Sequence, residues 1–95
     1  MKKETPLMPG SIVLSRAGRD QGRWFVVMAL PEEEYALIAD GELRKVEKPK
    51  RKKRKHLQVT QELNSSLQQK LVDGTPVSNK EIRACLTAVK PHEEG

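Results

Sequence analysis

Between Gly10 and Val59 the chain alternates short apolar runs with breaks rich in glycine, proline and charge. The runs are strand-length and contain isoleucine, valine and aromatic residues, which favour extended structure. Glycine in the breaks supplies the positive φ angles that tight reversals need. This pattern predicts a small β-barrel with strands at residues 11–16, 24–30, 35–39, 43–46 and 56–59.

The periodicity changes after Thr60. Leucines then recur four residues apart, at Leu63, Leu67 and Leu71, which is the spacing of one helical face. Thr60 is the expected N-cap of this helix, and Gly74 is expected to end it. A second helix is predicted to follow, because Ser78 and Glu81 have the spacing of a capping box.

The second helix has an apolar face formed by Ile82, Cys85, Leu86 and Val89. We expect both apolar faces to pack on the barrel or on each other, because so small a core would gain little by leaving them exposed. The alternative is a hairpin that binds another protein. For the 95-residue chain we therefore predict a flexible arm (1–9), a barrel (10–59), a helical hairpin (60–90) and a disordered tail (91–95).

Charge is concentrated in one segment. Residues 48–55 read KPKRKKRK, so seven of the eight positions are cationic, and the rest of the chain has a net charge of −2. Because Pro49 and like-charge repulsion oppose a helix, we predict a mobile basic loop that becomes ordered on a polyanion. Nucleic acid is the first expectation for that partner, and an anionic membrane surface is the second. Cations of this kind contact phosphates and do not by themselves distinguish RNA from DNA.

A second candidate contact lies in the turn between the first two predicted strands. Gly18 and Gly22 shape this turn, which Arg16, Arg19 and Arg23 surround. The planar guanidinium group suits two-pronged contact with a phosphate. The dipeptide Asp40-Gly41 is a strong signal for a short hairpin.

Other classes of function find little support in the sequence. There is no acid–base pair, no nucleophile with an orienting histidine, no phosphate-binding GxxxxGK[ST] loop and no cluster of metal ligands. We therefore expect neither an enzyme nor a cofactor. The lone Cys85 and the lack of an apolar run near 20 residues indicate a cytoplasmic protein without a membrane span.

Three stretches carry a resemblance to a known family. They are IVLSRAGRDQGRWFVV, then YALIADGELRKVEKPKRKKRKHLQ, and then the amphipathic tail. In these stretches the chain resembles bacterial KOW-domain RNA-binding proteins, which are similar to large-subunit ribosomal proteins of the fourteen-e type. The resemblance spans roughly residues 8–88, and its second stretch is the more specific.

The resemblance implies an SH3-like (KOW) barrel whose loops lie on RNA backbone. The expected partner is RNA, ribosomal RNA or the ribosome first, with contacts to ribosomal proteins and a monomeric state. The alternative is a protein-interaction module of the transcription or translation machinery, in which the basic loop meets an acidic protein surface. The predicted RNA-binding residues are Arg16, Arg19, Arg23, Arg44, Lys45, Lys48, Lys50, Arg51, Lys52, Lys53, Arg54, Lys55 and His56, and the predicted structural turn residues are Gly18, Gly22, Asp40 and Gly41.

Overall fold

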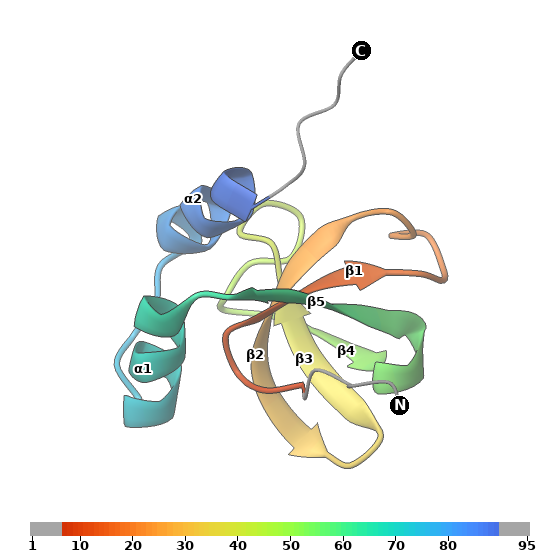
Figure 1. Ribbon diagram of the computed structural model, residues 1–95, viewed down its shortest axis with the longest axis horizontal. Coiled ribbons are helices and arrows are strands. Elements are labelled where there is room, and N and C mark those ends of the chain that lie inside the picture. The colour runs from red at the N-terminus through yellow and green to blue at the C-terminus, as the bar shows by residue number, and fades with distance from the viewer. Residues whose placement is uncertain (1–6, 90–95) are drawn as a thin grey trace.

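In the computed structural model, which describes residues 7–89, five strands form one antiparallel sheet that curls into a half-barrel (Figure 1). The strands are β1 (Ser11–Ser15), β2 (Trp24–Glu32), β3 (Tyr35–Ala39), β4 (Lys50–Lys53) and β5 (Leu57–Leu63), in the order β4-β3-β2-β1-β5. A 3₁₀ helix, η1 (Arg54–His56), joins β4 to β5, and the helices α1 (Ser65–Asp73) and α2 (Asn79–Val89) follow. The predicted fold class, a small five-stranded barrel with two C-terminal helices, is confirmed. Most of the predicted arm and all of the predicted tail lie outside the described residues.

The apolar runs of β1 and β2 are continuous because both faces of these strands are buried. Ile12 and Val26 face α1 and α2 and form one core cluster with four helix residues: Leu67, Ile82, Cys85 and Leu86. Val13 and Phe25 belong to a second cluster on the opposite face, which the curl of the sheet encloses. The helices therefore pack on the barrel, as the sequence predicts.

The boundaries of α1 differ from the prediction. Thr60 does not cap this helix, because it lies in β5 and its hydroxyl donates a 2.8 Å hydrogen bond to the Ile12 carbonyl. The cap is Asn64, whose side chain accepts a hydrogen bond from the Leu67 amide at 2.9 Å. Pairing with β1 extends β5 to Leu63, so strand structure continues past the predicted boundary at residue 59.

The ends of the two helices follow the local signals in the sequence. Gly74 ends α1 in the left-handed conformation, with a φ of 81°. Ser78 and Glu81 form the predicted capping box before α2: the Ser78 amide donates to Glu81 at 2.9 Å, and the Glu81 amide donates to the Ser78 hydroxyl at 3.1 Å. Such caps contribute about 1 kcal/mol each to helix stability.

The fourth strand is the main correction. The sequence predicts it at residues 43–46, directly after a short turn at Asp40-Gly41, but those residues are loop. The partner of β3 is β4, in the middle of the basic block, and residues 40–49 form the connection. The predicted mobile basic loop at residues 48–55 is therefore wrong from Lys50 onwards, where the chain is strand and then 3₁₀ helix.

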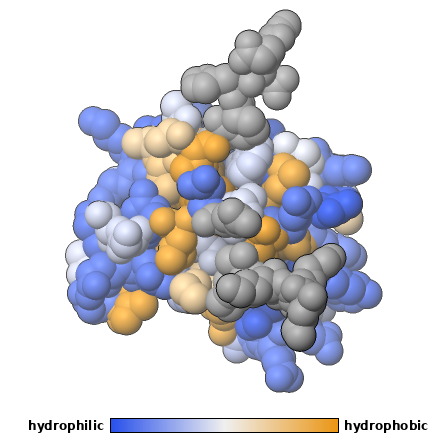
Figure 2. Space-filling view, viewed as in Figure 1, coloured by the Kyte–Doolittle hydropathy of each residue, from blue (hydrophilic) through white to orange (hydrophobic). Residues whose placement is uncertain are grey.

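Across residues 7–89, no helix has the length and apolar character needed to cross a membrane. In the view of Figure 2, hydrophilic residues make up most of the edge of the molecule. The large apolar side chains that are more than a third exposed in the described region are Leu43, Leu63 and Val72.

Candidate nucleic-acid interface

The pleat of β4 divides the basic block into two sets of side chains. Successive residues of a strand point to opposite faces. Lys50 and Lys52 turn towards the β1–β2 turn, whereas Arg51 and Lys53 point outwards and are exposed. Only part of the block can therefore meet a partner directly.

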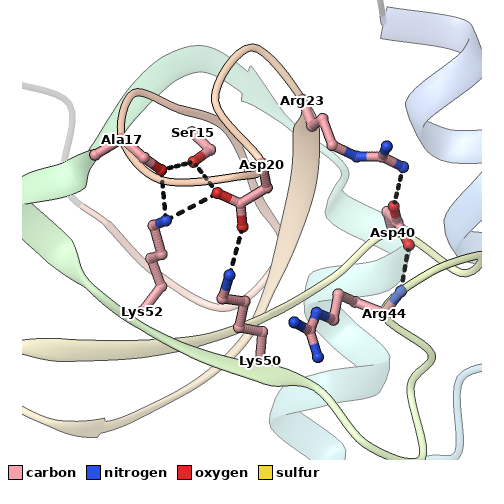
Figure 3. Close-up of polar contacts among 8 residues, drawn as sticks. All are labelled: Ser15, Ala17, Asp20, Arg23, Asp40, Arg44, Lys50 and Lys52. Atoms are coloured by element: carbon pink, nitrogen blue, oxygen red, sulfur yellow. Dashed lines mark hydrogen bonds and ion pairs between the residues drawn. The ribbon is translucent and has the colours of Figure 1, made fainter.

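Asp20 is the reason that two lysines point inwards (Figure 3). Its carboxylate accepts hydrogen bonds from Lys52 at 2.8 Å, from Lys50 at 3.0 Å and from the Ser15 hydroxyl at 2.8 Å. Burial opposes ionisation of Asp20, but these hydrogen bonds outweigh it and hold the pKa of the carboxyl well below its usual range. Lys52, which is 8% exposed, also donates to the Ala17 carbonyl at 2.7 Å. Its role in this structure is to tie β4 to the β1–β2 turn.

Glycine at position 18 is favoured by a positive φ angle and by the closeness of Lys52. Gly18 has a φ of +84°, and a Cβ atom there would lie 3.1 Å from the Lys52 ammonium nitrogen. Gly22, at the other end of the turn, has a φ of +88°. These two positions give the turn the shape that presents Arg19 to solvent.

Asp40 organises the loop between β3 and β4. One carboxylate oxygen accepts from the amides of Glu42 and Arg44, both at 2.9 Å, and the other accepts from Arg23 at 3.0 Å. Burial raises the pKa of Asp40, but the backbone amides and Arg23 lower it by more, so the group stays ionised. Asp40 and Gly41 thus act in a wider loop rather than in the predicted two-residue hairpin.

The β1–β2 turn and the β3–β4 loop face each other across a surface recess of about 320 Å³. We call it the cationic recess, and its lining residues are Arg19, Asp20, Arg23, Phe25, Asp40, Leu43, Arg44 and Lys50. Both carboxylates in this lining are already paired inside the protein, Asp20 with lysines and Asp40 with Arg23. Within residues 7–89, the side chains of Arg19 and Arg44 have no acidic partner. The recess is therefore suited to an anion.

A second depression lies at the other end of β4 and is less favourable to anions. Its volume is about 370 Å³, and Glu33 and Glu34 line it together with Lys53, Arg54 and Lys55. Arg54 is further held by the backbone, since its Nε donates to the Tyr35 carbonyl at 3.0 Å. These cations are close to acidic side chains that compete with an external phosphate.

The remaining predicted RNA-binding residues are dispersed. Arg51 stacks over the Tyr35 ring at 3.7 Å from its centroid and forms an ion pair with Glu32. Arg16 donates to Gln58 at 3.1 Å. Three further positions are Lys45 and Lys48, which are exposed in the β3–β4 loop, and His56, which is half-buried at the end of η1.

Sequence reasoning missed two features of this region. One is the role of Asp20 as an internal counter-ion. Its signal in the sequence is weak: an acidic residue lies between Gly18 and Gly22, and two lysines in a later strand, Lys50 and Lys52, are separated by one residue. The other is Leu43, predicted as a strand residue but found 71% exposed at the cationic recess. No group of histidine, cysteine or acidic residues within the described part of the chain has the arrangement of a metal site.

Comparisons with known proteins add no relative. No model of a protein family matches the chain, and no curated protein matches its sequence. The KOW resemblance therefore stays a prediction from the sequence, and the arrangement of cations around the recess is the starting point for function.

Proposed function

We propose that the protein binds RNA by contacting backbone phosphates with the cations at the cationic recess. Ribosomal RNA, in a cytoplasmic ribosome-associated setting, is the RNA that the KOW resemblance favours. The single observation that carries the proposal is the convergence of Arg19, Arg23 and Arg44 from two separate segments on one recess. The proposed activity is binding and includes no catalytic step.

Internal neutralisation of the aspartates makes the recess attractive to phosphate. Asp20 and Asp40 would repel an anion if they were unpaired, but lysines and Arg23 offset their charges. Arg19 and Arg44 then supply guanidinium groups that have no acidic partner among residues 7–89, and a guanidinium group of this kind is available for two-pronged contact with a phosphate. Lys45 and Lys48 extend the positive surface along the same loop.

The positions of these cations are largely fixed before binding. The β1–β2 turn is tied to β4 through Asp20, and the β3–β4 loop is folded around Asp40. A ligand consequently loses little affinity to the ordering of protein segments. This differs from the prediction made from the sequence, which is a mobile basic loop that becomes ordered on binding.

The test uses two double variants with the same net charge. Arg19→Ser with Arg44→Ser removes two arginines of the recess, and Lys53→Ser with Lys55→Ser removes two exposed lysines beside Glu33 and Glu34. Fluorescence anisotropy with a ribosomal RNA fragment should show that the arginine variant binds with an affinity roughly 10- to 100-fold lower than that of the wild type. For a single-stranded segment the slope of log K against log salt should also become shallower by about 1.4, since each contact contributes about 0.7.

The lysine variant is the control for total charge and should lose less than about fivefold at moderate salt, where the Debye length is about 8–10 Å. Equal losses in the two variants would refute the recess as the main site. Binding of the wild type that is indifferent to salt would refute the phosphate mechanism altogether. A partner retained after ribonuclease treatment, with no RNA affinity, would favour the alternative of a protein-interaction module.

A further inference from the structure

We infer that the cationic recess receives one unpaired nucleotide of the RNA and that Leu43 contacts its base. This inference rests on the RNA binding proposed above and makes it more specific. It predicts a preference for RNA that contains a bulged or looped-out nucleotide over an uninterrupted duplex.

The first support is the position of Leu43 on a loop that holds it in place. The residues on both sides of it, Glu42 and Arg44, donate their amides to the same oxygen of Asp40 at 2.9 Å. The Arg44 carbonyl closes the loop by accepting from the Asp40 amide at 2.9 Å. Leu43 is thereby fixed at the tip of the loop with its side chain 71% exposed.

The second support is the anchoring of this loop to α2. Arg83 donates to the Gly41 carbonyl at 2.8 Å, and the Asn79 side chain accepts from the Val46 amide at 2.8 Å. A Cβ atom at Gly41 would lie 2.5 Å from the Asn79 carbonyl oxygen, so the loop and the helix are in close contact. An exposed leucine on a loop anchored at both ends is preorganised for contact with a ligand.

The third support is the combination of apolar and cationic groups in a space of limited size. Leu43 lines the recess together with Arg19 and Arg44. A volume of about 320 Å³ is near the lower end of the range for small-ligand sites, which is about 300–1,000 Å³, and it suits one nucleotide rather than a length of duplex. Phosphate suits the arginines, and the face of an unstacked base suits the leucine.

Three hairpin RNAs with the same stem test the inference by fluorescence anisotropy with the full-length protein. The first stem is fully paired, the second has a single unpaired adenosine, and the third has an abasic residue at that position. The adenosine bulge should bind about tenfold more tightly than the paired stem, as expected for burial of one leucine side chain against a base. The abasic bulge should lose most of this gain, because the sugar and phosphate remain but the base is absent.

The matched variants are Leu43→Ser and Val72→Ser. Both replace an exposed apolar side chain, and Val72 lies on α1 and is 68% exposed. Leu43→Ser should abolish the preference for the adenosine bulge over the paired stem, whereas Val72→Ser should leave that preference in place. Circular dichroism and thermal unfolding check that both variants are folded.

Two results would overturn the inference and leave the proposed function standing: salt-dependent binding of equal strength to all three RNAs, or a bulge preference that survives Leu43→Ser. Displacement of the bulged RNA by free adenosine monophosphate at equal affinity would also overturn it, because the recess would then be a site for a small molecule. If none of the RNAs binds at low salt, the proposed function fails as well.

Discussion

The ion pair between Asp20 and Lys52 makes a sharp prediction about stability. Lys52 is 8% exposed, and its ammonium group has two acceptors, Asp20 at 2.8 Å and the Ala17 carbonyl at 2.7 Å. In Asp20→Asn the side chain keeps its shape and one oxygen but loses its charge. The substitution therefore leaves a buried cation without its counter-ion, and a second cation, Lys50, loses the same partner.

We expect Asp20→Asn to lower the free energy of unfolding by about 3 kcal/mol. Removing one member of a buried ion pair typically costs about 3–5 kcal/mol, and the Asn side chain retains part of the hydrogen bonding. A domain of this size has a total free energy of unfolding of about 5–15 kcal/mol, so the variant should be severely weakened. The midpoint of thermal unfolding should fall by roughly 12–24 °C, at about 4–8 °C per kcal/mol. Urea and thermal unfolding followed by circular dichroism measure both quantities.

A second substitution separates lost charge pairing from other effects. Lys52→Met in the Asp20→Asn background removes the stranded cation, and the double variant should recover to within about 1 kcal/mol of the wild type, since buried pairs replaced by uncharged groups of similar volume are often neutral in stability. Lys53→Met is the matched control, because this neighbouring lysine is exposed on the outer side of β4, and it should change stability by no more than about 0.5 kcal/mol.

The reasoning is refuted if Asp20→Asn costs less than about 1 kcal/mol, a loss typical of a mutation without a special mechanism. Equal effects of Lys52→Met and Lys53→Met would also refute it, because the two lysines would then be equivalent, as in a mobile basic loop. The experiment thus decides between the strand found in the structure and the loop predicted from the sequence.

Three further predictions concern the turns, acid stability and the first helix. Gly41→Ala should lower the free energy of unfolding by more than about 2 kcal/mol, because φ is +80° and the new Cβ would lie 2.5 Å from a backbone oxygen of α2. Gly22→Ala, where φ is +88° but the space around the new Cβ is open, should lower it by only about 1–2 kcal/mol. The wild type should lose stability as the pH falls below about 4, because the pKa of Asp20 is lower in the folded state than in the unfolded state. At pH 3 this group should contribute about 1 kcal/mol less to the free energy of unfolding than at pH 7. In urea unfolding, the stability of Asp20→Asn should therefore depend less on pH than that of the wild type. Asn64→Ala should cost about 1 kcal/mol in urea unfolding through loss of the α1 cap, and no change would place the start of the helix elsewhere.

The elements that could be predicted from the sequence are those set by local chemistry. The strands β1, β2 and β3 follow from apolar runs bounded by turn residues, and the capping box at Ser78 and Glu81 specifies the start of α2. The switch to helical spacing also predicts two helices. In each case the residues that decide the structure are neighbours in the chain, so a single sequence is sufficient to identify them.

The strand β4 could not be predicted because its stabilising partner is distant in the sequence. Four consecutive cationic residues have a low intrinsic propensity to form a strand, and repulsion between their like charges opposes an ordered structure. Asp20, 30 and 32 positions earlier in the chain, reverses this for Lys50 and Lys52. Thr60 was misassigned for a similar reason, because the Ile12 carbonyl that its hydroxyl contacts is 48 positions away.

The same long-range contacts change what the positive charge of this protein can do. If the basic block were a free loop, each lysine would be equivalent, and binding RNA would require the whole segment to lose conformational freedom. With Lys50 and Lys52 held inwards by Asp20, the inner half of the strand stabilises the fold, and the external charge is displayed on turns that are already ordered. The cations available to a phosphate are then determined by side-chain direction rather than by density along the chain, which is why the recess between two loops, and not the most basic sequence, is the proposed centre of binding.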